Sequence, residues 1–144
     1  MARRAGAAAC VTALLLTATG CAGSDAEPRP VATDATATPA PSSLVGSDAF
    51  EAAVAEPGRV TINVHVPFEG SIRGTDVTVP YNTVERAAGE LPSVGTPLAI
   101  YCRSGSMSAE AAPVLTAMGY DDIVELDGGM TAWVDDGRGL LRER

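Results

Sequence analysis

An uninterrupted apolar run near the middle of the chain most constrains its fold. Residues 97–101 read Pro-Leu-Ala-Ile-Tyr, without a single charged side chain. A strand of this composition has no face for water, so it is typical of a parallel sheet covered by helices on both sides. Extended segments are predicted at 59–64, 76–79 and 122–126, and helices at 48–56, 83–89, 108–118 and 130–136. This alternation predicts an α/β fold, a parallel sheet in a three-layer domain.

The charge balance excludes two classes of partner. The chain of 144 residues has 18 acidic and 10 basic residues, every basic one an arginine, and a formal net charge of −8. A nucleic-acid-binding protein needs a basic patch to neutralise phosphates, and a polybasic membrane segment needs clustered cations. We therefore expect no nucleic-acid partner. Three cysteines are also too few for a disulfide scaffold.

The first twenty residues have the organisation of a bacterial export signal. Arg3 and Arg4 precede a weakly apolar run at 7–18, which is too short and too rich in Ala and Thr for a typical spanning helix. The run ends in Leu-Thr-Ala-Thr-Gly-Cys21, which resembles the lipobox of bacterial lipoproteins. We predict a signal peptide at 1–20 and a lipid anchor on Cys21. The alternatives are a retained spanning helix, or ordinary cleavage near Gly20 or Ala22 that leaves Cys21 a free thiol.

Residues 21–43 are predicted to form a linker between this anchor and the folded domain. The segment is dominated by Ala, Thr, Pro and Ser, and it shows no helical or strand periodicity. Such a composition buries too little apolar surface to offset chain entropy, and its prolines favour extended conformations. A generic disordered terminus has the same composition, and the lipobox favours the linker. The folded domain is predicted at 44–144.

The chemistry concentrates at Cys102. This thiol directly follows the buried strand, at the sheet edge where ligands of parallel α/β folds bind. The following loop, Arg103 to Met107, leads into a helix. Its backbone N–H groups and the helix N-terminus favour negative charge, Gly105 permits the turn that lets amides converge, and Arg103 adds a cation. These features favour the thiolate, which is the nucleophilic form of cysteine. We expect its sulfur at the mouth of a ring of inward-pointing N–H groups.

The predicted fates of the other two cysteines favour a functional role for Cys102. Cys10 leaves with the signal peptide and Cys21 is predicted to be acylated, so Cys102 is the one free thiol of the exported domain. The structural alternative is a small buried cysteine of the core.

Cys-Arg-Ser-Gly-Ser-Met at 102–107 resembles the active-site loop of rhodanese-homology domains, written C-R-x-G-x-(R/T/K). The segment at 119–133 resembles the family ending G-Y-x-x-V-x-x-L-x-G-G-x-x-A-W, and Ile72-x-Gly74 resembles its H-I-x-G. The resemblance covers roughly residues 45–138. It implies a sulfurtransferase in which Cys102 carries a persulfide, held by a substrate-binding loop of Arg103, Ser104, Gly105, Ser106, Met107 and Ser108.

The chain departs from the family pattern at four positions near this loop. The family's Asp-Val-Arg is Asn63-Val64-His65 here, the His before Ile is Ser71, and the last loop position is Met107. Fewer charges and hydroxyls then face the substrate, which predicts weak turnover of thiosulfate. His65 and Asn63 are candidate auxiliary residues, with a structural role as the alternative for His65. Related cysteine phosphatases place Arg six residues after the cysteine, where this chain has Ser108, which argues against phosphatase activity.

Together these features predict an exported sulfurtransferase, anchored by lipidated Cys21 to the outer face of the cell membrane. The resemblance implies a small sulfane-sulfur donor and a thiol or cyanide acceptor, with a protein thiol as a further candidate partner. We expect no cofactor and no metal, because one histidine and one free cysteine do not form a metal site. The alternative function is a non-catalytic rhodanese-homology module that binds a partner or senses reactive sulfur.

Overall fold

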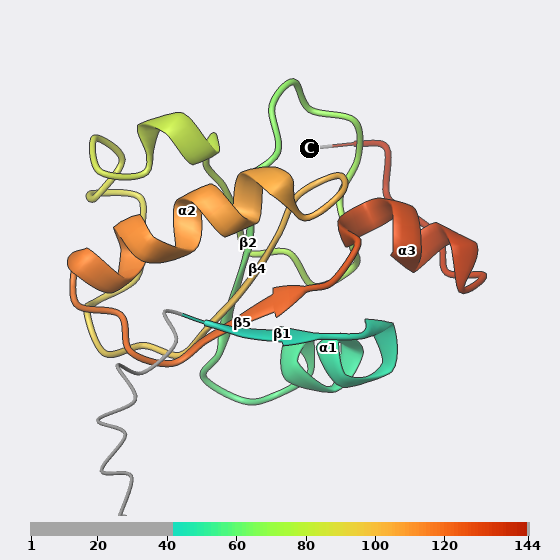
Figure 1. The fold of residues 1–144 in the computed structure, drawn as a ribbon, viewed down its shortest axis with the longest axis horizontal. Coiled ribbons are helices and arrows are strands. Elements are labelled where there is room, and N and C mark those ends of the chain that lie inside the picture. The colour runs from blue at the N-terminus through green and yellow to red at the C-terminus, as the bar shows by residue number, and fades with distance from the viewer. Residues whose placement is uncertain (1–41, 144) are drawn as a thin grey trace, which may run out of the picture. The chain divides into compact units, whose positions relative to one another are not determined.

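The computed structural model describes residues 42–143, so the predicted signal peptide, Cys21 and nearly all of the predicted linker lie outside the described residues. The described chain forms a five-stranded sheet in the order β1-β5-β4-β2-β3, and every pairing between strands is parallel (Figure 1). Its strands are β1 (Ser43–Val45), β2 (Val60–Asn63), β3 (Val77–Thr78), β4 (Leu98–Tyr101) and β5 (Ile123–Leu126). The helices are α1 (Ser47–Val54), η1 (Tyr81–Thr83), α2 (Ser106–Ala117) and α3 (Gly129–Asp135).

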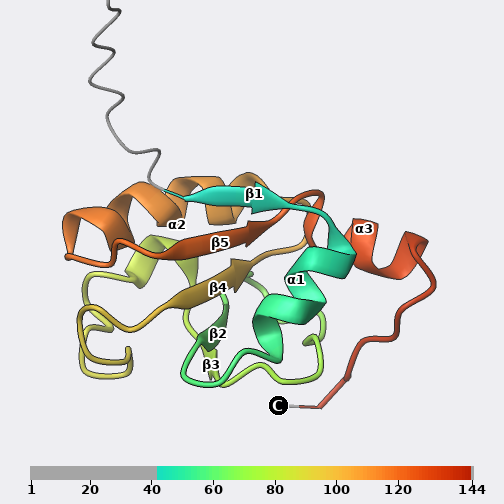
Figure 2. The same cartoon turned by 90° about the horizontal axis from the view of Figure 1, so that it is seen from below.

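Helices cover both faces of this sheet, which confirms the predicted three-layer α/β fold. Beneath α2, Leu98 and Ile100 of β4 pack with Ile62 and Leu115. On the other face Ala99 and Tyr101 pack with side chains of α1 and α3, namely Phe50, Met130 and Trp133. Figure 2 shows α1 and α2 on opposite sides of the strands. All four residues of β4 are buried, as the uninterrupted apolar run predicts.

Two elements of the structure differ from the prediction. The segment predicted as a helix at 83–89 begins at the last residue of η1 and continues as turns, because Val84 is its one buried hydrophobic residue and supplies no apolar stripe. The edge strand β1 was not predicted, and it begins at Ser43, one residue inside the predicted linker. Three residues with Leu44 exposed carry too little pattern to identify a strand.

The two edges of the sheet differ in character. At the amino ends of the strands, the Arg59 guanidinium binds both carboxylate oxygens of Asp122, at 2.9 and 3.1 Å, and also donates to the Leu98 carbonyl. This contact ties β2, β4 and β5 together where each begins. At the carboxyl ends lie the loops with the predicted site residues.

No helix among residues 42–143 is both long and apolar enough to cross a membrane.

Candidate active site

Cys102 lies directly after β4, where the central strand meets the carboxyl edge of the sheet. Its side chain is 1% exposed and belongs to the core cluster beneath α2, so the sulfur sits at the floor of the loop rather than at the predicted mouth. Arg103, Ser104 and Ser106 of the same loop are exposed above it. Any molecule that reaches the sulfur therefore has to pass the loop and the side chains around it.

A backbone amide of the loop points at the sulfur. The N–H of Gly105 donates a hydrogen bond to Cys102 Sγ at 3.1 Å. Gly105 has φ +94°, a left-handed conformation that glycine adopts without strain, and α2 begins at the next residue. Buried Ser108 donates from its hydroxyl to the Gly105 carbonyl at 2.9 Å, and its oxygen lies 3.9 Å from Cys102 Sγ. The buried sulfur thus has a backbone N–H directed at it and a hydroxyl close by.

The start of α3 orients two further peptide groups of the loop. The N–H of Met130 donates to the Cys102 carbonyl, and the N–H of Thr131 donates to the Arg103 carbonyl, both at 2.9 Å. The Thr131 hydroxyl adds a second donor to the Arg103 carbonyl at 3.0 Å. In a planar trans peptide the N–H points away from the carbonyl. Because both carbonyls face α3, the N–H groups of Arg103 and Ser104 face away from it.

The approach of α3 to the loop depends on Gly129. This glycine has φ +58°, and a Cβ placed there would lie 2.5 Å from the Cys102 carbonyl oxygen and 2.7 Å from the Arg103 carbonyl carbon. Any side chain would therefore push α3 away from the carbonyls that it holds. The close approach at Gly129 thus holds the Cys102 loop in place.

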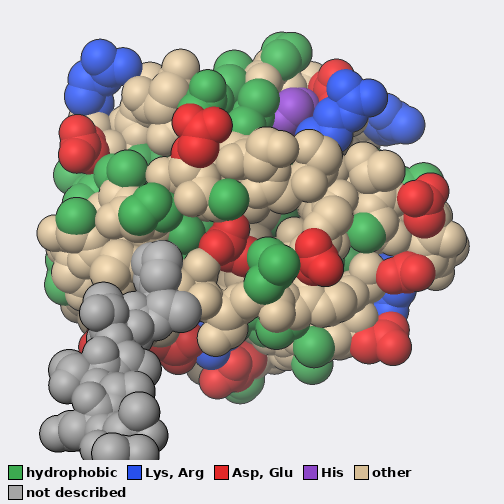
Figure 3. Space-filling model, in the orientation of Figure 1, with side chains coloured by type: hydrophobic (Ala, Val, Ile, Leu, Met, Phe, Trp, Pro, Cys, Tyr) green, Lys and Arg blue, Asp and Glu red, His purple; other side chains and the backbone are tan. Residues whose placement is uncertain are grey.

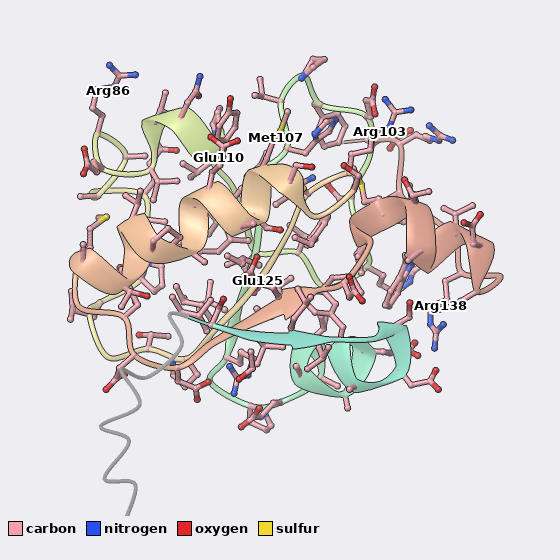
Figure 4. All side chains as sticks on the ribbon, viewed as in Figure 1. Arg86, Arg103, Met107, Glu110, Glu125 and Arg138 are labelled. Atoms are coloured by element: carbon pink, nitrogen blue, oxygen red, sulfur yellow. The ribbon has the colours of Figure 1, made fainter. Side chains whose placement is uncertain are left out.

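A chain of side chains joins the two ends of the loop. Met107 Sδ lies 3.3 Å from Nδ1 of His65, and Nε2 of His65 lies 3.2 Å from Oε2 of Glu69. The same carboxylate faces Arg103, with Nε 3.4 Å from Oε2 and a guanidinium N–H donated to Oε1 at 3.5 Å. Figure 4 shows Met107 and Arg103 on the same side of the molecule. In Figure 3 only a small part of the histidine, coloured purple, is visible beside basic side chains, because His65 is buried.

Asn63 and Ser71, two of the departures from the family pattern, act on the 64–71 loop instead of the sulfur. Buried Asn63 donates from Nδ2 to the Gly70 carbonyl and accepts the N–H of His65, both at 2.9 Å. Ser71 pairs through its backbone with Leu141, at 2.7 and 2.8 Å. They hold the loop that carries His65 and Glu69, and neither has a hydrogen bond to the Cys102 loop among the contacts described above.

Sequence reasoning brought out Cys102, its loop and His65, but it missed Glu69. A single acidic residue in a loop has no periodicity or spacing that distinguishes it from a solvated charge. Its relation to Arg103 depends on a fold that brings positions 34 residues apart together. The one available signal was its position four residues after His65, on the loop that follows β2.

A surface hollow of about 450 Å³ adjoins the site. Its lining has mixed charge, with Arg103 and Arg142 opposed by Glu69 and Asp135, and an apolar part that includes Met130 and exposed Val134. Within the described part of the chain there is no group of three or more His, Cys, Asp or Glu side chains that could hold a metal ion. The chemistry of the site rests on one sulfur atom, the peptide groups around it and a few charged side chains.

Comparison with known proteins places this geometry in a family. Over 37 residues the chain is 46% identical to the thiosulfate sulfurtransferase GlpE of Shewanella oneidensis, a stretch that covers 26% of this chain and 37% of that protein. The aligned region thus spans little more than a third of that relative's length.

Solved structures show the same fold. A rhodanese-related protein from Thermoplasma volcanium has a TM-score of 0.60 at 23% identity, covering 70% of this chain and 99% of that one. The reduced CoADR-RHD of Bacillus anthracis has a TM-score of 0.59 at 25% identity, covering 70% of this chain and 18% of that one. The model of the rhodanese-like domain family matches residues 57–136, which is more than half of the chain. The chain therefore belongs to the rhodanese-like domain family.

Proposed function

We propose that this protein is a sulfurtransferase that moves sulfane sulfur through a persulfide on Cys102. The observation that carries the proposal is the N–H of Gly105, which points at Cys102 Sγ at 3.1 Å. An amide directed at Cys102 Sγ stabilises the thiolate that attacks in the first step and that leaves in the second. The orientation of the Arg103 and Ser104 peptides by α3 keeps the loop in the shape that this chemistry needs.

The reaction has two steps. The Cys102 thiolate attacks the outer sulfur of a donor R–S–S⁻, or of thiosulfate, and forms a new S–S bond. The original S–S bond breaks, and the leaving thiolate or sulfite takes the bonding electron pair. An acceptor thiol or cyanide then attacks the terminal sulfur of the Cys102 persulfide, and Cys102 leaves as the thiolate. Covalent catalysis of this kind divides one difficult transfer into two easier displacements.

The burial of Cys102 favours a second candidate function. A sulfur that is 1% exposed is hard for a bulky donor to reach. A non-catalytic module of the same family would bind a partner through its loops, or react only with small reactive sulfur species. The two candidates differ in whether Cys102 accepts sulfur from a donor and passes it on.

The mass of the Cys102 peptide separates these functions. The full-length protein in detergent is incubated with thiosulfate or an organic persulfide, blocked with iodoacetamide and digested with trypsin. We expect the peptide at 87–103, which ends one residue after Cys102, to gain one sulfur atom and to lose it when cyanide is added.

The matched control changes a different cysteine. Cys21→Ser removes a thiol from the same chain and should leave the sulfur gain at 87–103 intact, whereas Cys102→Ser should abolish it. If neither donor adds sulfur to the wild-type peptide, the chain is not a sulfurtransferase and the binding or sensing function takes its place.

The proposal extends to where the protein works. We propose that the protein is exported and anchored to the outer face of the cell membrane through lipidated Cys21. The support is the sequence alone: two arginines, a short apolar run, and small residues directly before the cysteine. Several acyl chains on one residue give stable anchoring, since each buried methylene contributes about 0.8 kcal/mol.

A further inference from the structure

We propose that Glu69 determines donor specificity, so that the site favours uncharged or zwitterionic organic persulfides over doubly negative inorganic donors such as thiosulfate. The inference rests on the proposed function, because it names the substrate class of the same site. It comes from the position of the Glu69 carboxylate, which contacts both Arg103 and His65.

Glu69 pairs with Arg103, the positive charge that an anionic sulfur donor would need. The Arg103 guanidinium is the cation of the Cys102 loop, and its Nε lies 3.4 Å from Glu69 Oε2. His65 Nε2 approaches the same oxygen at 3.2 Å. Glu69 therefore offsets part of the positive charge of Arg103, and an anion that binds the exposed side of this guanidinium also meets the Glu69 carboxylate. The family loop C-R-x-G-x-(R/T/K) carries a second polar position at its end, and here it is Met107.

The backbone around Glu69 holds this carboxylate in place. The Arg142 guanidinium donates to the Glu69 carbonyl at 3.3 Å, and Asn63 Nδ2 donates to the carbonyl of the next residue, Gly70, at 2.9 Å. Ser71 is then fixed by its backbone pair with Leu141. Three consecutive residues are thus tied to other elements, so Glu69 cannot swing away from the loop with its backbone.

The charges around the site disfavour the binding of thiosulfate, which is a dianion. A dianion must reach a sulfur that is 1% exposed by passing Arg103, whose positive charge is partly offset by the Glu69 carboxylate. Repulsion between like charges lowers the local concentration of the dianion and the rate of its productive encounter. An organic persulfide brings one sulfur anion or none, and its body can be accommodated in the adjoining hollow of mixed charge, where Arg103 and Arg142 face Glu69 and Asp135.

The transfer step is the same for both donors and needs no oxidant or reductant. With an organic persulfide, Cys102–S⁻ and R–S–SH give Cys102–S–SH and R–S⁻. One S–S bond forms, one breaks, and the leaving thiolate takes the electron pair. With thiosulfate, sulfite leaves with the pair instead. The difference lies in the charge that enters and departs past Glu69, which an uncharged side chain at position 69 should remove.

The test compares two donors in Glu69→Gln, using the full-length protein in detergent and cyanide as acceptor. We expect kcat/KM for thiosulfate to rise about five- to tenfold, and kcat/KM for 2-hydroxyethyl persulfide to stay within about twofold. Raising the salt concentration should shrink the gain with thiosulfate, because Glu69 is 41% exposed and charges at such sites are screened. Glu90→Gln removes the same charge from an exposed turn and should change neither value.

A second measurement reads the electrostatic effect without sulfur transfer. Iodoacetate and iodoacetamide react with the same thiol and differ by one negative charge, and their rates are followed on the tryptic peptide at 87–103. We expect the rate ratio of iodoacetamide to iodoacetate to fall at least threefold in Glu69→Gln and to be unchanged in Glu90→Gln.

The outcomes distinguish this inference on donor specificity from the proposed sulfur transfer on which it rests. Equal changes for both donors together with an unchanged alkylation ratio would show that Glu69 is merely structural and would overturn the inference, leaving sulfur transfer intact. If no variant accepts sulfur from either donor, the proposed function fails, and the specificity proposal fails with it. A shifted alkylation ratio in that case would show only that Glu69 governs the charge at Cys102.

Discussion

The geometry of the site depends on the backbone of a single residue, Gly129. It lets the first amides of α3 reach the carbonyls of Cys102 and Arg103, at a distance that excludes any side chain. Its φ of +58° adds a second requirement for glycine. The chemistry of the loop is therefore supported by a residue with no functional group of its own.

We predict that Gly129→Ala lowers the free energy of unfolding by at least about 2 kcal/mol, because the left-handed conformation alone costs about 1–2 kcal/mol and the contact with the Cys102 carbonyl adds to it. Urea unfolding measures the loss, and alkylation of the Cys102 peptide measures the change in the loop. Gly137→Ala is the matched control, since Gly137 has φ +82° but nothing lies within 4 Å of an added Cβ. Equal losses in the two variants would contradict the steric argument.

Single residues also show where sequence reasoning reached its limit. Cys102 and Gly105 could be predicted because strand, loop and helix follow each other along the chain. Glu69 could not, because its contact with Arg103 is made only after β2 and β4 pair in the sheet. The extent to which Cys102 is buried could not be predicted either, because exposure depends on what packs over a loop.

Among the elements, β4 links the site to the opposite side of the sheet. Its last residue, Tyr101, is fully buried on the α1 face, and its hydroxyl accepts the N–H of Ile72 at 2.9 Å and lies 2.7 Å from Thr75 Oγ1. Burial raises the pKa of the Tyr101 hydroxyl above its ordinary value of 10.0, with opposing contributions from its hydrogen-bond partners. The strand that presents Cys102 thus also holds the segment after the 64–71 loop.

We predict that Tyr101→Phe lowers the free energy of unfolding by about 1–3 kcal/mol, because it leaves the buried N–H of Ile72 without its acceptor. Tyr120→Phe, which removes a hydroxyl that donates to the Pro92 carbonyl, should cost less than about 1 kcal/mol because that contact is only partly buried. Stability of the wild type should fall as the pH rises above about 10, where tyrosine ionises first in the unfolded chain. Urea unfolding from pH 8 to 11 should show a smaller fall in Tyr101→Phe, and an equal fall would contradict the assignment.

The elements that sequence predicted well are those with a strong internal pattern. β4 and α2 carry apolar or helical sequence patterns, and α2 ends at Ala117, one residue before the predicted end. The edge strand β1 and the turns after η1 are short and partly exposed, so their conformation comes from neighbours. β1 is extended because it pairs with β5 through Ser43, Leu44 and Val45. The local sequence pattern does not predict this pairing.

For the whole molecule, the parallel sheet separates two edges with different tasks. Arg59 and Asp122 hold the amino ends of the strands together, and the carboxyl ends carry the Cys102 loop, His65 and Glu69. The alternation of strands and helices in the sequence was enough to predict that the site lies at the carboxyl ends, but it did not predict the contact between Arg59 and Asp122. It could not predict that the chain near Leu141 returns to pair with Ser71 and so closes the second loop of the site.

At this scale the membrane anchor gives a separate prediction. Cys21→Ser removes the predicted site of acylation, so we expect the protein to move from the membrane fraction to the soluble exported fraction. Immunoblotting of fractionated cells measures the shift, and mass spectrometry of the wild-type N-terminus detects the acyl chains. Cys102→Ser, which also removes one thiol, should stay in the membrane fraction. Unchanged membrane association of Cys21→Ser would contradict the lipid anchor and leave the sulfur chemistry untouched.

The direction of β1 has a practical consequence. β1 runs parallel to its one neighbour, β5, and starts at Ser43, so the chain enters the domain at the amino ends of the strands, away from Cys102. Coupling the protein to a bead, a sensor chip or a fusion partner through that side leaves the path to the sulfur open. Coupling near Leu141 would instead disturb the segment that pairs with Ser71 and so holds the 64–71 loop.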